Sequence, residues 1–148
     1  MTAYPSQTTF ANGSCMCTPA ALYWAIACVA RMLPPDCGGP RMRILMQTAS
    51  DTQRAITESL SRPASFMLQQ HEVLAGIQLP TSLGGVEMYG YCTQRQADMV
   101  EYIHVDEIYD MLQKGDVMVI TGGGHTTAVF REDERVYTHD SGPATVCC

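Results

Sequence analysis

The amino-acid sequence predicts a single α+β domain, with helices leading and an antiparallel sheet at the end of the chain. The candidate helices come first, and three strand-like runs at 117–121, 126–131 and 135–139 close the chain. This segregation of helices from strands is typical of α+β proteins. A chain of 148 residues suits one domain that buries roughly 68–70% of its unfolded surface. We therefore expect one domain over 1–148 that needs no metal or disulfide to fold.

An apolar segment near the N-terminus predicts a central, buried helix. Residues 1–14 are polar and turn-rich, so an extended arm is expected there. Residues 20–30 are apolar throughout, with Pro19 before them and Pro34 after them. A proline at the first helical position and another after the last one mark the two ends of a helix of about four turns. A helix that is apolar on every side is buried.

Helices are also predicted over three further ranges: 51–61, 64–75 and 105–114. The first follows the capping-box form of Ser50–Gln53, and the other two end before Gly76 and Gly115. The apolar run 44–46 fits either a strand or a helix. Alternation of apolar and polar residues over 86–92 predicts a strand.

The last two strands are expected to form a β-hairpin that brings a histidine and an aspartate together. A charged segment separates two alternating runs, as in a hairpin turn. With a two-residue turn at 132–133, Thr127 lies opposite Thr138 and His125 lies opposite Asp140. Opposed Cβ atoms are ~4.5–5.5 Å apart, which lets a carboxylate orient an imidazole. An odd-numbered loop would move the aspartate to the other face.

A cysteine directly before the predicted central helix is the candidate nucleophile. Cys17 lies where a helix N-terminus offers unpaired N–H groups and about half a positive charge. Such an environment lowers a thiol pKa from ~8.5 towards ~3.5–7.5. The same N–H groups can stabilise an oxyanion. Cys15 lies off the helix and is the weaker candidate, and a small buried structural cysteine is the alternative role for Cys17.

The candidate cysteine, histidine and aspartate are the three residue types of a thiol-based catalytic site. A nucleophilic thiol needs a base, and the base needs a third group to orient it. The chain offers Cys17, His125 and Asp140 in that order. No metal or organic cofactor is implied, because the C-x-C and C-C spacings differ from the C-x2-C pairs of zinc sites.

Two segments resemble the papain-like cysteine peptidases. The sequence C-T-P-A-A-L at 17–22 is similar to the opening of the peptidases that process bacteriocin leaders. The sequences G-H-T-T-A-V-F at 124–130 and T-H-D-S-G-P at 138–143 resemble those peptidases and the viral deubiquitinases of herpesvirus tegument proteins. The resemblance covers both ends of the chain well and residues 34–115 hardly at all. It implies a papain-like fold with the nucleophile at the start of the central helix.

Two departures from the family pattern concern individual residues. Papain-like enzymes carry a glutamine about six residues before the nucleophile as an oxyanion donor. Here that position is Ala11, so Gln7 or Asn12 is the candidate substitute. Tegument-type enzymes carry Asp-x-His, whereas Gly142 lies two residues after Asp140. The ordinary papain-like order is therefore favoured.

Composition limits the partners and the compartment. The net charge of −6 and the lack of a basic stripe argue against nucleic-acid binding. The longest apolar stretch, 20–30, is far short of the ~18 residues that a membrane span needs. No signal sequence is recognised at the N-terminus. We therefore expect a cytoplasmic protein, in the host cytoplasm if it is viral, with its seven cysteines as free thiols.

The implied function is hydrolysis of peptide or isopeptide bonds. The viral resemblance and the single lysine, Lys114, favour ubiquitin or a ubiquitin-like protein as the substrate, hence a deubiquitinase. Processing of a polyprotein or a leader peptide is the nearest alternative. An acyltransferase using the same triad and a non-catalytic binding module are the others. His139 falls on the opposite hairpin face from Asp140 and is expected to be structural or exposed.

Overall fold

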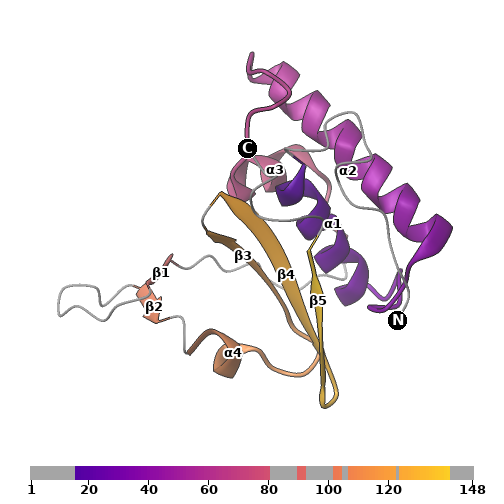
Figure 1. The fold of residues 1–148 in the computed structure, drawn as a ribbon, viewed down its shortest axis with the longest axis vertical. Coiled ribbons are helices and arrows are strands. Elements are labelled where there is room, and N and C mark those ends of the chain that lie inside the picture. The colour runs from indigo at the N-terminus through magenta and orange to yellow at the C-terminus, as the bar shows by residue number, and fades with distance from the viewer. Residues whose placement is uncertain (1–15, 81–89, 93–101, 105–106, 123, 141–148) are drawn as a thin grey trace.

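Three helices pack on a three-stranded antiparallel sheet in the computed structural model, which describes residues 16–80, 90–92, 102–104, 107–122 and 124–140. The helices within these ranges are α1 (Cys17–Val29), α2 (Gly39–Ser59), α3 (Gln70–Gly76) and the short α4 (Ile108–Met111). The strands are β1 (Gly90–Cys92), β2 (Tyr102–His104), β3 (Val117–Gly122), β4 (His125–Glu132) and β5 (Arg135–His139). Helix α1 contacts β3 and β4 as well as α2 and α3 (Figure 1). The predicted α+β class is confirmed.

Helix α1 is the predicted central helix. Ten of its 13 residues are buried, because one side packs against the sheet and the other against α2. Pro19 sits in the first turn, where its missing N–H breaks no helical hydrogen bond. The helix ends at Val29, and Arg31 follows in a left-handed conformation with φ +56°. The Met32 N–H donates to the Ala27 carbonyl across this turn, as in a Schellman motif.

Helix α2 is much longer than the predicted helix over 51–61. It begins after Gly38 with Pro40 in its first turn, so the ambiguous run 44–46 is helical. The capping-box form at Ser50–Gln53 lies in the middle of α2 and caps nothing, which corrects the prediction. The buried positions repeat at intervals of three and four, which places them on one helix face: Met42, Met46, Ala49, Gln53 and Ile56.

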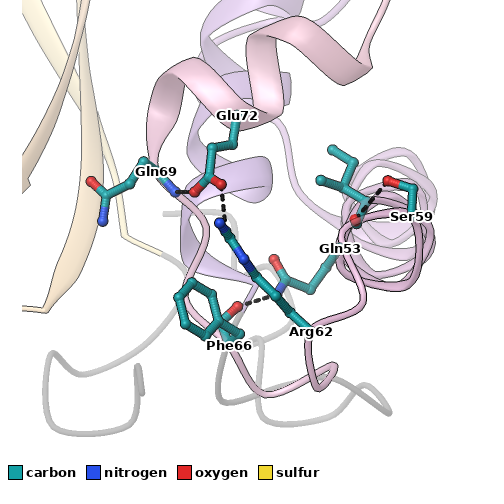
Figure 2. A network of polar contacts seen from close by, with 7 residues as sticks. Gln53, Ser59, Arg62, Phe66, Gln69 and Glu72 are labelled. Atoms are coloured by element: carbon teal, nitrogen blue, oxygen red, sulfur yellow. Dashed lines mark hydrogen bonds and ion pairs between the residues drawn. The ribbon is translucent and has the colours of Figure 1, made fainter.

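The chain between α2 and α3 is held by side-chain contacts and is not helical. The Gln53 amide donates to the backbone carbonyls of Ala64 (3.2 Å) and Phe66 (2.7 Å). The Arg62 guanidinium pairs with Glu72 and lies over the Phe66 ring, 4.6 Å from its centroid (Figure 2). These contacts place the polypeptide of this connection against α2 and α3.

Helix α3 corrects the predicted helix over 64–75. It occupies only Gln70–Gly76, and Gln69 caps it. The Glu72 carboxylate accepts the Gln69 N–H at 3.0 Å (Figure 2). The Gln69 side chain accepts the backbone N–H of Glu72 in return, which completes a capping box. Because this reciprocal cap satisfies the first turn, the helix begins at residue 70.

The sheet has the strand order β3-β4-β5, and its strands agree closely with the three predicted ones. The register differs from the prediction. We expected Thr127 opposite Thr138, but Val129 occupies that place. The reason is that residues 133–134 form the turn, one position later than predicted. A shift of two residues leaves every side chain on its predicted face.

One face of the sheet and α1 enclose the main core. The buried Ala128 and Phe130 of β4 share a cluster with Trp24 of α1. His139 of β5 is fully buried there, and its ring stacks on the Trp24 indole with centroids 5.5 Å apart. His139 is therefore structural and not exposed. Desolvation lowers its pKa from 6.5 to about 4.

The remaining described elements are short. Strands β1 and β2 form a parallel pair, of which only β1 falls within a predicted strand. Helix α4 covers four residues of the helix predicted over 105–114. The predicted arm over 1–14 lies outside the described residues. None of the described helices combines the length and the apolar character that crossing a bilayer requires.

Candidate functional site

The predicted histidine and aspartate are in direct contact. His125 is the first residue of β4 and is only 6% exposed, and Asp140 directly follows β5. The imidazole Nε2 lies 2.6 Å from the Asp140 Oδ1. An ionised carboxylate only accepts hydrogen bonds, so Nε2 carries the proton and donates. The structure thus brings these two predicted site residues together, despite the shifted register.

The second imidazole nitrogen of His125 is in a different environment. Nδ1 is buried and has no hydrogen-bond partner among the described residues. With Nε2 protonated, neutral His125 keeps its lone pair on Nδ1. A buried acceptor without a partner is destabilising by about 1–3 kcal/mol. Nδ1 is therefore the nitrogen that is free to take a proton from a reacting group.

Cys17 lies at the predicted place but not in the predicted chemical form. It is the first residue of α1 and is fully buried. Its sulfur is disulfide-bonded, so the expectation of a free thiol at this position is wrong. Cys28 and Cys37 are free thiols, which excludes both as its partner. Sequence spacing could not reveal this bond, because a disulfide depends on two cysteines meeting in space.

The start of α1 meets the start of β4 through a pair of threonines. Thr18 follows Cys17, Thr126 follows His125, and the two hydroxyl oxygens are 2.9 Å apart. Both threonines are at most 1% exposed. Consecutive Cα atoms are only 3.80 Å apart, so each threonine lies close in the chain to the predicted site residue before it. The contact between the threonines therefore brings together the segment that contains Cys17 and the segment that contains His125.

The threonine contact is part of a longer polar chain that sequence reasoning missed. The Thr126 hydroxyl also lies 2.9 Å from the Thr121 hydroxyl of β3. The Gln70 amide of α3 donates to that Thr121 oxygen at 2.9 Å and to the Val119 carbonyl at 3.1 Å. Threonines are common in strands for their shape alone, so the sequence contained no signal that singled these out.

The positive end of α1 is not compensated by its own first turn. No acidic residue lies in that turn, and Met16 makes no side-chain cap. The positive end of the helix dipole therefore favours a negative charge at the position of Cys17. The candidate oxyanion donors Gln7 and Asn12, and the alternative nucleophile Cys15, lie outside the described residues.

Within the described ranges, no three His, Cys, Asp or Glu side chains gather so that they could hold a metal ion. Comparisons with protein-family models, curated proteins and solved structures found no match for this chain.

Proposed function

We propose that this protein is a thiol hydrolase of papain-like type that cleaves peptide or isopeptide bonds. Cys17 is the nucleophile, His125 the general base and acid, and Asp140 the group that orients the imidazole. The observation that carries the proposal is the 2.6 Å contact from His125 Nε2 to Asp140, together with the buried Nδ1, for which the described part of the chain offers no hydrogen-bond partner. That combination is what a base needs to be held in one tautomer and remain available.

The proposed mechanism gives each of these three residues one role. His125 Nδ1 takes the proton of the Cys17 thiol, and the thiolate attacks the substrate carbonyl carbon. Backbone N–H groups at the start of α1 stabilise the resulting oxyanion. The imidazolium then protonates the leaving amine, which leaves a thioester. Water attacks the thioester with His125 again as base, and this step releases the carboxylic acid and restores the thiol.

Activity requires that the disulfide of Cys17 be reduced first. A sulfur in a disulfide is not a thiolate and does not attack a carbonyl. A thiol reductant supplies two electrons, and exchange through a mixed disulfide yields two cysteine thiols. A reducing cytoplasm, where we place the protein, supplies such thiols as glutathione.

Ubiquitin or a ubiquitin-like protein is the proposed substrate. The support is the viral-type sequence resemblance and the single lysine of the chain, Lys114, which is exposed and paired with Asp133. A protein almost without lysine offers few acceptor sites to ubiquitin-transfer enzymes. Cleavage of a polyprotein or leader peptide uses the same chemistry and is the alternative substrate class.

A non-catalytic module is the second candidate, and the disulfide bond of the fully buried Cys17 favours it. In that case the bond is a structural cross-link that stabilises the fold. Cys17→Ser would then leave partner binding unchanged and lower stability.

A ubiquitin probe with a C-terminal electrophile distinguishes these candidates. On reduced protein, we expect a covalent adduct at Cys17 that is absent in Cys17→Ser and in His125→Ala. Cys37→Ser is the matched control, because Cys37 is a free thiol that takes no part in the proposed site. An adduct with a peptide probe alone indicates peptide processing, and transfer to an added amine in preference to water indicates an acyltransferase. No adduct with any probe would contradict the hydrolase proposal.

A further inference from the structure

We propose that Thr18 and Thr126 are positioning residues, whose hydroxyl contact holds the Cys17 sulfur in place relative to the His125 imidazole. This inference rests on the proposed function and adds two residues to it. The threonines touch no substrate atom in the proposed mechanism. They act through the residues that precede them in the chain.

The placement of the two hydroxyl groups carries the argument. Each threonine directly follows one of the two reacting residues, and their oxygens are 2.9 Å apart across the boundary of α1 and β4. Neighbouring contacts at this boundary are apolar and include the small Ala21 and Ala128. Apolar contacts are non-directional, so they set the spacing of helix and strand but not their offset along the strand. A hydrogen bond depends on direction and fixes that offset.

The rest of the polar chain keeps the contact in register. Gln70 must present its NH2 group to the Val119 carbonyl, because a carbonyl only accepts. The same NH2 group donates to the Thr121 oxygen, which also lies within hydrogen-bond distance of Thr126. Thr126 therefore has partners on two sides, from β3 and from α1. Consecutive hydrogen bonds in a buried chain polarise and strengthen one another.

This topology identifies the cleanest substitution. Thr18→Val removes the contact between α1 and β4, but the Thr126 hydroxyl keeps its partner Thr121. Thr18→Ser retains the hydroxyl and is the rescue variant. Thr57→Val is the matched control, because Thr57 is equally buried but its hydroxyl bonds only within α2. Thr126→Val removes the other end of the same bond and replaces Thr18→Val if that variant does not fold.

The measurement is the rate of Cys17 alkylation by iodoacetamide from pH 4 to pH 9 in reduced protein, with site assignment by mass spectrometry. We expect the wild-type rate to reach a plateau near pH 6 as the thiolate–imidazolium pair forms. Thr18→Val should move the profile up by about one pH unit, which lowers the rate about tenfold near pH 4, on the rising part of the wild-type profile. Thr18→Ser should stay within about twofold of wild type. Thr57→Val should lose stability and keep the wild-type profile.

Three results would overturn the inference, and they differ from one another. A wild-type profile in both Thr18→Val and Thr126→Val shows that the contact does not position the sulfur. An equal change in Thr57→Val shows that lost stability, and not position, alters the rate. A wild-type protein without a plateau, whose Cys17 reacts as an ordinary thiol and ignores His125→Ala, removes the proposed function and this inference with it.

Discussion

Acid should destabilise this protein through the buried His139. The perturbation is a fall in pH from 7.5 to 4, compared between the wild type and His139→Phe. The imidazole of His139 is fully buried and stacked on Trp24. Burial lowers its pKa to about 4, Asp140 opposes that effect, and His125 adds to it. Phenylalanine keeps an aromatic ring against the indole and does not titrate.

The sign and the size of the effect follow from linkage. Between pH 6.5 and about 4 the unfolded chain binds a proton at residue 139 and the folded protein does not. The free energy of unfolding therefore falls as the pH falls through this window and levels off below it. Each pH unit contributes ~1.4 kcal/mol, so crossing the whole window removes about 3 kcal/mol. Above pH 6.5 the contribution of His139 to stability is complete.

Urea denaturation at a series of pH values measures this contribution. Trp24 is the single tryptophan and reports unfolding by fluorescence, with far-UV circular dichroism as a second probe. Groups far from His139 are the same in both proteins, so the wild-type value minus the His139→Phe value reports the titration of residue 139 together with its interactions with Asp140 and His125. We expect that difference to change by about 3 kcal/mol between pH 7.5 and pH 4. Parallel curves for wild type and His139→Phe would refute the reasoning.

Three further predictions concern packing, a helix end and a thiol. Gly76→Ala should destabilise by about 1–3 kcal/mol in urea denaturation, because the new Cβ would lie 2.8 Å from the Ile56 Cδ1; adding Ile56→Val should recover part of the loss, and strict additivity would contradict the clash. Ser61→Gly should stabilise by about 0.5–1 kcal/mol, since Ser61 has φ +55° after α2. Ser59→Gly, inside the same helix, should destabilise by a similar amount, and the same sign for both would refute the account. Cys28 should resist iodoacetamide in the native state at pH 8, because burial raises its pKa to about 12; the free thiol of Cys37 is half-buried and should be labelled before that of Cys28 in a mass-spectrometric time course.

The C-terminal ends of α1 and α2 were harder to predict than the helices themselves. The sequence predicted α1 correctly as the buried central helix but placed its end beyond Val29. The chain turns at Arg31 and at Ser61 in left-handed conformations, and both helices close with Schellman-type bonds. Glycine is the usual residue at that position and the usual signal. Because neither residue is glycine, the usual glycine signal was missing at both ends.

The histidine–aspartate contact was predictable because the side chains of a strand alternate between two faces. An even-numbered turn puts His125 and Asp140 on one face of the hairpin, whichever even register forms. The register itself was wrong by two residues, and Asp140 reaches His125 from a position just beyond β5. The sequence alone thus placed His125 and Asp140 on one face of the hairpin. The register of β4 against β5 depended on the turn at 133–134.

Local patterns in the sequence determined the α+β class, the apolar helix at the beginning, the three strands at the end and the shared face of His125 and Asp140. These properties depend on periodicity and on residues close together in the chain, which a linear sequence displays directly. Only the tertiary structure decided that Cys17 is disulfide-bonded and that the hydroxyl groups of Thr18 and Thr126 meet. The two threonines are 108 residues apart in the chain. Contacts over such separations form when helix and sheet pack together, so no local pattern specifies them.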